Sequence, residues 1–170
     1  KAQNFLIVIA SYTFYGWWDW KFLSLIIIST IIDYLIGVKL SKEENKKIRK
    51  ALLWTSIIVN LGFLGFFKYY NFFLDNFITA FSFFGNDINV NSLNIILPVG
   101  ISFYTFQTLS YTIDVYKKKL VPTKDFIAFS AFVCFFPQLV AGPIERATNL
   151  LPQFLINRKF DYSKSVSGLQ

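Results

Sequence analysis

The sequence predicts an all-α, polytopic membrane protein, and three observations support that prediction. Hydrophobic residues fill 54% of the 170 positions and charged residues only 16%, whereas soluble domains usually carry about 25% charged residues. Several runs contain no charge, the longest being Ile88–Ile113, and a membrane-spanning helix needs about 20 apolar residues. The basic residues gather in short segments between these runs, as in cytoplasmic loops. The net charge of +7 therefore indicates membrane topology rather than a nucleic-acid partner.

The first half of the chain is predicted to form three spanning helices. Ala2–Trp18 is a helix ending in tryptophans, which are typical of the membrane–water interface. Phe22–Val38 returns as a second helix, interrupted only by Asp33, a carboxylate that is either functional or a hydrated or paired structural group. Ser41–Lys50 holds five basic and two acidic residues and is predicted to be a cytoplasmic loop. Ala51–Phe67 is the third helix.

Tyr69–Phe84 has a different pattern, because its polar residues recur on one helical face among phenylalanines. These residues are Asn71, Asp75, Thr79 and Ser82. The segment is either another span or an interfacial helix. A span would place the lysine-rich segment Lys117–Lys124 outside, so we expect an interfacial helix on the outer side, followed by an outer loop at Gly85–Asn91.

The second half is predicted to cross once and then to enter the membrane without crossing it. Ser92–Tyr116 crosses, and Phe126–Ile144 is long enough to cross but contains Pro137 and Pro143. A full crossing would also place the later basic residues outside. We therefore expect a re-entrant broken helix that lines a cavity, since non-helical backbone at depth needs protein or water to satisfy it. Asn149–Gln170 is predicted to be cytoplasmic or interfacial.

Three motifs occur in the order ASYTFYGWWDWKF, LPVGISFYTFQTLSYTIDVYKKK and FFPQLVAGPIERATNLLPQF. Together they resemble the membrane-bound O-acyltransferase family, and most closely its bacterial alginate O-acetyltransferase branch. The D-alanyl-transfer branch of the same family is the alternative. The resemblance covers essentially the whole chain and implies the N-terminal part of a helical bundle around a central funnel, with residues 1–170 forming part of one membrane domain.

The resemblance also implies a reaction and a setting. An acetyl group would pass from acetyl-CoA or another acyl thioester, with no cofactor held permanently, to a cell-surface polysaccharide such as alginate. The expected location is the inner membrane, in multiple passes, with the lipid bilayer, an extracytoplasmic acetyltransferase protein and the polysaccharide acceptor as partners. Two other classes, a transporter fragment and a non-catalytic scaffold, also remain open, because broken helices with polar residues at depth occur in transporters.

The family's catalytic residue is a histidine, and this sequence contains none. We expect that histidine downstream of the third motif, so the chain is interpreted as an internal fragment that is inactive alone. No residue of the chain is assigned a catalytic role, because the carboxylates are scattered singly. The one cysteine, Cys134, and the lack of histidine predict no metal site.

Two groups of residues are candidates for lining the funnel. The alternative role is helix–helix hydrogen bonding for the first group and an ordinary interfacial anchor for the second. In the first group, Pro98 and Gly100 are predicted to bend a helix and leave carbonyls open to a cavity. Glu145 and Arg146 of the second group are predicted to pair at the funnel mouth, or Arg146 to attract the phosphates of coenzyme A. The first group is Gly100, Ser102, Tyr104 and Gln107, and the second is Gln138, Gly142, Pro143, Glu145 and Arg146.

Overall fold

The computed structural model describes residues 1–83, 98, 100–143, 145–158 and 162–168, and all regular secondary structure within them is α-helical. The helices are α1 (Ala2–Trp18), α2 (Trp20–Lys42), α3 (Lys46–Phe83), α4 (Ile101–Tyr116), α5 (Phe126–Cys134), α6 (Phe136–Ala141), α7 (Ala147–Leu155) and α8 (Tyr162–Ser167). The predicted all-α fold is therefore confirmed.

A single residue separates α1 from α2. Asp19 has an extended backbone, with φ of −160°, and its carboxylate accepts a hydrogen bond from the Lys21 backbone N–H at 2.8 Å. That hydrogen bond caps the first turn of α2. The neighbouring tryptophans Trp17, Trp18 and Trp20 are exposed, as expected of side chains that anchor helix ends in the membrane interface.

The predicted cytoplasmic loop Ser41–Lys50 is shorter in the structure. Helix α2 continues to Lys42 and α3 begins at Lys46, because the lysines and arginine of this segment are good helix formers. Asn45 starts α3 by accepting a hydrogen bond from the Lys47 backbone N–H at 2.9 Å. Only Glu43–Asn45 connects the two helices.

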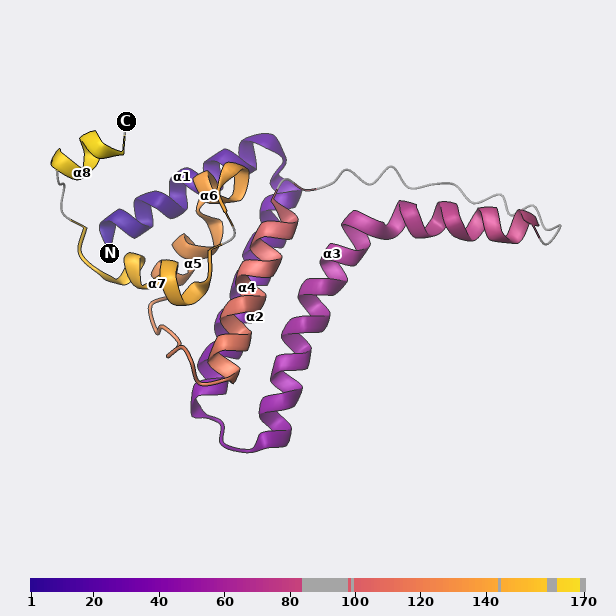
Figure 1. Cartoon of the computed structure of the whole chain (residues 1–170), viewed down its shortest axis with the longest axis horizontal. Coiled ribbons are helices and arrows are strands. Elements are labelled where there is room, and N and C mark those ends of the chain that lie inside the picture. Colours follow the sequence, from indigo (N-terminus) through magenta and orange to yellow (C-terminus); the bar gives the residue numbers. More distant parts are fainter. Residues whose placement is uncertain (84–97, 99, 144, 159–161, 169–170) are drawn as a thin grey trace.

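The expectation of two helices at Ala51–Phe67 and Tyr69–Phe84 is wrong, because Ala51–Phe67 and residues 69–83 lie in the single helix α3. No proline interrupts this part of the sequence, so the backbone hydrogen bonds continue through Lys68. Helix α3 has 38 residues, which is about 57 Å and far longer than the hydrocarbon core of roughly 30 Å. Figure 1 shows α3 bending and its second half extending away from the other helices. We call residues 69–83 the α3 arm.

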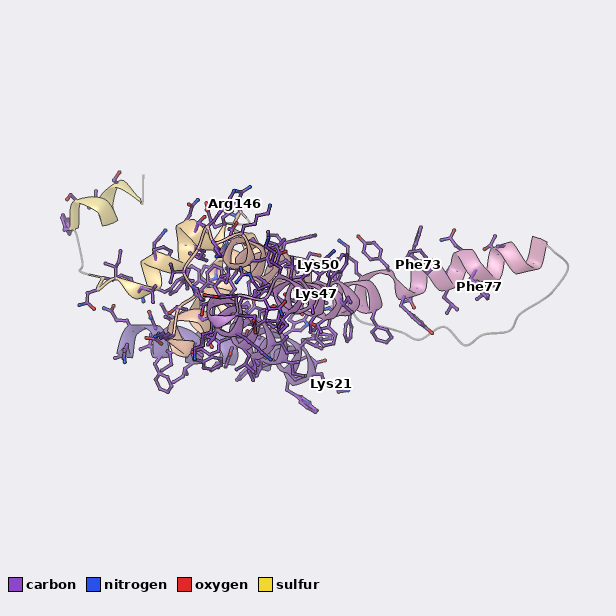
Figure 2. The ribbon with its side chains drawn as sticks, turned by 90° about the horizontal axis from the view of Figure 1, so that it is seen from below. Lys21, Lys47, Lys50, Phe73, Phe77 and Arg146 are labelled. Carbon is purple, nitrogen blue, oxygen red and sulfur yellow. The ribbon has the colours of Figure 1, made fainter. Side chains whose placement is uncertain are left out.

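Two helices are long and apolar enough to span a membrane within the described residues. One is α2, and the other is the Lys46–Ala80 part of α3. The phenylalanines Phe72, Phe73 and Phe77 of the α3 arm are exposed, and Figure 2 shows the last two on the extended part of the helix. An interfacial position for the arm stays a prediction, and the expected outer loop Gly85–Asn91 lies outside the described residues.

Helices α2, α3 and α4 run alongside one another (Figure 1). A buried network of polar side chains joins them. The Asp33 carboxylate accepts hydrogen bonds from Ser56 Oγ at 2.5 Å, Asn60 Nδ2 at 2.8 Å and Thr112 Oγ1 at 3.3 Å. All four residues are buried. Asn60 Oδ1 in turn accepts from Ser29 Oγ at 2.8 Å. Of the two alternatives for Asp33, the structure favours a paired structural group that joins three helices.

The predicted broken helix is confirmed at Phe126–Ile144. Helix α5 ends at Cys134, the backbone leaves helical geometry at Phe135 (ψ of 95°), and α6 begins with Pro137 in its first turn. After the break the chain turns back, because α7 packs against both α5 and α4. The segment predicted as mixed, Asn149–Gln170, contains most of α7 and all of α8. Entry of the broken helix from the cytoplasmic side stays a prediction.

We expect Asp33→Ala to lower the free energy of unfolding of the full-length protein by about 2 kcal/mol. The substitution removes the acceptor for three buried donors, and such hydrogen bonds are typically worth about 0.6 kcal/mol each in membranes. Thermal unfolding in detergent measures the change. The exposed carboxylate of Asp75 provides the control, since Asp75→Ala is expected to change stability by less than about 0.5 kcal/mol. Equal effects would contradict a structural role for the network.

The α3 arm is expected to lie in the membrane interface with its phenylalanines toward lipid. Nitroxide labels at Phe73→Cys and Asp75→Cys, each in a Cys134→Ala background, test this in full-length protein in liposomes. Label 73 should collide more with oxygen, which concentrates in lipid, and label 75 more with a water-soluble nickel chelate. Similar accessibility at both positions would mean that the arm either spans the bilayer or stands in water.

Candidate functional site

Helix α4 begins at Gly100, where the backbone takes a left-handed conformation with φ of 76°. Glycine adopts this conformation without steric cost. The Pro98 carbonyl accepts from the Ile101 N–H at 3.3 Å, so these residues form a turn before the helix. The expectation that Pro98 and Gly100 bend a helix is therefore wrong, because Gly100 is the N-cap at which α4 starts.

The two glutamines singled out in the sequence meet in the structure, although they are 31 residues apart. Gln107 Nε2 donates to Gln138 Oε1 at 3.4 Å and to the Phe132 carbonyl at 2.8 Å. Both glutamines are buried. The Phe132 carbonyl lies in the last turn of α5, where the break at Phe135 leaves carbonyls without helical partners. We call Gln107 and Gln138 the glutamine pair, and it joins α4 to both sides of the broken helix.

The turn after α6 completes this arrangement. Gln138 Nε2 donates to the Pro143 carbonyl at 3.1 Å, and the Gly142 N–H donates to the Gln138 carbonyl at 2.9 Å. A Cβ atom at Gly142 would lie only 2.7 Å from the Gln138 Cα. Glycine is required there because the backbone passes so close to the glutamine.

Two buried tyrosines, Tyr104 in the first turn of α4 and Tyr15 near Gly100, lie close to the start of α4. Tyr104 and Tyr15 are 1% and 3% exposed, and neither hydroxyl has a hydrogen-bond partner in the described residues. A Cβ built on Gly100 would lie 3.8 Å from the Tyr15 hydroxyl and 3.4 Å from Leu139 of α6. The start of α4, the end of α1 and the broken helix therefore converge at one place. Unpartnered buried hydroxyls are costly, so a polar ligand or water at this place would gain hydrogen bonds.

An apolar pocket of about 450 Å³ lies at the edge of this region. Its lining comes from the aromatic end of α1, the start of α2 and Val140 of α6. The lining residues are Thr13, Phe14, Tyr15, Trp17, Trp18, Phe22 and Val140. The pocket that Tyr15 and Val140 help to line is therefore mainly aromatic, and no charged side chain of the described residues lines it.

Three other candidate residues, Ser102, Glu145 and Arg146, form no hydrogen bond with the glutamine pair in the described residues. Ser102 accepts a hydrogen bond from Lys68 Nζ at 3.5 Å, toward α3. Glu145 accepts from Asn149 Nδ2 at 3.5 Å, and the structure shows no ion pair between Glu145 and Arg146, so the predicted pairing is wrong. Arg146 is exposed and supplies the backbone cap of α7, which leaves its side chain available to solvent or ligand.

The sequence does not mark Tyr15 as part of this region. Tyr15 stands in the first motif, just before the tryptophans predicted to lie in the membrane interface, and only its packing beside Gly100 reveals it. The assembled groups are amides and phenols, which donate and accept hydrogen bonds but are not bases near neutral pH. Within the described residues no three histidine, cysteine or carboxylate side chains come together. The described groups of this region can donate and accept hydrogen bonds, and they include no base for proton transfer near neutral pH.

Comparison with known proteins gives consistent relatives for this chain. It is 42% identical over 156 residues to the probable alginate O-acetylase AlgI of Pseudomonas syringae pv. tomato, and 40% identical to that of Azotobacter vinelandii. Each match covers 91% of the chain. A peptidoglycan O-acetyltransferase of Helicobacter pylori is 33% identical over 189 aligned positions, covering 96% of the chain. No family model and no solved structure matches the chain.

The chain spans only about a third of the length of these relatives. It covers 30% of the Pseudomonas protein, 31% of the Azotobacter protein and 35% of the Helicobacter protein. Roughly two thirds of each relative therefore has no counterpart in residues 1–170.

We expect Gly142→Ala to destabilise the full-length protein by about 1–3 kcal/mol, because the added methyl group meets the Gln138 backbone and forces it to shift. Thermal unfolding in detergent measures this. Gly65→Ala is the matched control, since a Cβ at Gly65 has no neighbour within 4 Å and alanine favours a helix by up to about 1 kcal/mol over glycine. A stabilising Gly142→Ala would contradict the close approach.

Proposed function

Because the chain belongs to the membrane-bound O-acyltransferase family, in the branch of the alginate O-acetylases, we propose that it is part of a membrane O-acetyltransferase of a cell-surface polysaccharide. The observation that supports this best is the 42% identity to alginate O-acetylases over 91% of the chain. A match of that length must include the two helices of the glutamine pair. Residues 1–170 would act together with parts of the protein that lie beyond them.

The proposed acceptor is an alginate-like polysaccharide, with peptidoglycan as the second candidate. Four relatives at 40–42% identity are named alginate O-acetylases, and one at 33% identity is named a peptidoglycan O-acetyltransferase. Both polymers present sugar hydroxyls outside the cytoplasmic membrane. The reaction class is the same for either acceptor: the acyl–oxygen ester bond forms on a sugar hydroxyl while the donor loses its acyl group.

The proposed donor is acetyl-CoA or another acyl thioester on the cytoplasmic side of the inner membrane. Two basic segments, one between α2 and α3 and one after α4, lie at the same end of the helical bundle, which supports a cytoplasmic position for that end. The acetyl group must then travel toward the other end to reach an exported polymer. An extracytoplasmic acetyltransferase protein is the proposed partner for delivery to the polysaccharide.

The glutamine pair is proposed as a positioning device for this transfer, not as a catalytic centre. It fixes the broken helix against α4, where Tyr15 and Tyr104 keep unpartnered hydroxyls within the described part of the chain. A passage wall with amide and phenol groups suits a thioester carbonyl, which accepts hydrogen bonds. Proton removal from the acceptor needs a base within hydrogen-bond reach, and the family resemblance places that role on a histidine outside these residues.

Expression of the full-length gene in a host that exports alginate but lacks its own O-acetylase tests the proposal. Mild alkali should release acetate from the purified polymer only when the protein is present. Release of D-alanine instead would support the D-alanyl branch. If alginate carries neither acyl group and peptidoglycan carries acetate, the acceptor is peptidoglycan and not alginate. If neither polymer carries an ester, the proposed acetyltransferase activity is contradicted. The scaffold and the transporter would then be the remaining alternatives.

We expect Gln138→Ala and Gly142→Leu to lower acetyl transfer by the full-length protein about ten- to hundred-fold, since a shift of about 1 Å in a positioning element has effects of that size. Cys134→Ala is the control, because this buried thiol lies in α5 just before the break without contributing to the glutamine pair. Polymer-bound acetate, normalised to protein in the membrane, is the readout. Equal transfer by all three variants would contradict the positioning role.

Residues 1–170 alone are expected to transfer no acetyl group, because they contain no histidine to act as base. The measurement is acetate on the polymer after expression of this segment beside the full-length protein. Transfer by the segment would show that the reaction does not depend on the expected downstream histidine.

A further inference from the structure

Two basic segments that are far apart in the sequence meet at one end of the bundle. Lys39–Lys50 covers the end of α2 and the start of α3, and Asp114–Asp125 covers the end of α4 and the connection to α5. Together they hold ten basic and four acidic side chains. Figure 1 shows the end of α2, the start of α3 and the end of α4 at the same end of the molecule. We call this region the basic end.

Arg49 is the buried centre of the basic end, at 8% exposure. Its guanidinium donates to the carbonyls of Leu40, of Glu43 at 3.1 Å and of Tyr116 at 2.7 Å, and it lies 5.5 Å from the Tyr116 ring centroid. It thereby binds the C-terminal ends of α2 and α4, whose carbonyls carry partial negative charge. These hydrogen bonds leave part of arginine's five N–H donors for other acceptors.

A pocket of about 300 Å³ opens over Arg49. One part of its lining is polar, formed by Arg49, Ser41 and Lys118, and the other is apolar, formed mainly by Leu120, Val121 and Pro122. Val121 is 87% exposed, so the apolar part of the lining faces outward from the bundle. The pocket therefore places positive charge directly beside apolar surface.

Lys118 occupies a backbone position that normally belongs to glycine. Its φ of 58° makes it the one non-glycine residue with positive φ among the described residues, and its N–H donates to the Val115 carbonyl at 3.1 Å after the end of α4. Left-handed residues after a helix are usually glycine. A lysine at this position accepts unfavourable backbone geometry while its side chain lines the pocket.

The carboxylates of the basic end leave this positive charge uncompensated. Glu43 accepts from the Asn45 N–H at 3.0 Å, and Asp125 accepts from the Ala128 N–H at 3.1 Å. Glu44 and Asp114 complete the set, and none of the four forms an ion pair in the described part of the chain. An anion that enters the pocket therefore meets Arg49 and Lys118 without competition from a bound carboxylate.

We propose that this pocket binds the phosphate group of an anionic phospholipid. A phospholipid carries a phosphate next to hydrocarbon, which matches the polar and apolar parts of the lining. The pocket lies where α2 and α3, the two helices able to span a membrane within the described residues, have their basic ends, at the depth of the lipid headgroups. Basic pockets between spanning helices bind such headgroups. The proposal does not depend on the acetyltransferase activity.

Native mass spectrometry of the full-length protein with added phosphatidylglycerol or phosphatidylcholine tests the proposal. We expect phosphatidylglycerol to be retained preferentially, and Lys118→Gly to weaken its binding about five-fold, the factor that corresponds to one basic residue near an anionic membrane. Glycine suits the left-handed backbone at this position, so the variant should fold.

Lys21→Ala is the matched control. Lys21 lies in the first turn of α2, at the end of that helix opposite to the basic end, and Figure 2 shows it apart from Lys47 and Lys50. Its binding of phosphatidylglycerol should equal that of the unchanged protein. Equal retention of both lipids, or equal loss in Lys118→Gly and Lys21→Ala, would overturn the proposal.

A third arm distinguishes a lipid from a soluble phosphate. Coenzyme A is added in place of lipid, and binding is again compared between the unchanged protein and Lys118→Gly. Coenzyme A binding that depends on Lys118, with no preference for phosphatidylglycerol, would assign the pocket to a soluble phosphate and overturn the lipid assignment. Phosphatidylglycerol binding that depends on Lys118 and is unaffected by coenzyme A would support the proposal.

Discussion

The structure depends on one constraint: polar groups inside a bundle of apolar helices need hydrogen-bond partners supplied by other helices. The Asp33 network meets that constraint by joining α2, α3 and α4 through Ser56, Asn60 and Thr112. Each donor reaches the carboxylate only when the three helices have one rotation and one register. A single buried carboxylate therefore selects one packing among many that apolar contacts alone would allow.

The same constraint governs the broken helix. A break in a helix leaves carbonyl groups without hydrogen-bond donors. Gln107 of α4 donates to one of these carbonyls, that of Phe132. The pair also holds the turn at Gly142 and Pro143, so the break has a defined shape. Close to the start of α4, the hydroxyls of Tyr15 and Tyr104 have no partner in the described residues. The region thus combines a hydrogen-bonded frame with unused hydrogen-bonding groups, which is what the proposed acyl passage requires.

Arg49 applies the constraint at the basic end. Its guanidinium satisfies carbonyls at the ends of two helices and fixes them to the start of a third. The positive charge that orients a membrane protein is therefore also a structural element in this chain. Under the proposed lipid site, the residues that close the bundle are also the ones that face the headgroups.

Much of the secondary structure follows from the sequence alone, because it depends on local chemistry. The helix Ala2–Trp18, the break near Pro137 and the basic segments that mark one end of the bundle all follow from apolar runs, proline and charge. The sequence also indicates Gln107 and Gln138 as polar groups at depth, and its motifs indicate the family. Runs of apolar residues measure helix length well, but they do not show where a helix continues past a polar residue, so they divide α3 wrongly at Lys68.

Only the tertiary structure decided which polar groups meet. Asp33 and Thr112 are 79 residues apart, and the Gln107 side chain donates to Gln138, 31 residues away and in another helix. Tyr15 joined the candidate site through its place beside Gly100, which no pattern in its own segment reveals. The physical reason is that such contacts depend on the rotation and tilt of whole helices. These are fixed by packing and hydrogen bonding across the bundle, not by the periodicity of any one segment.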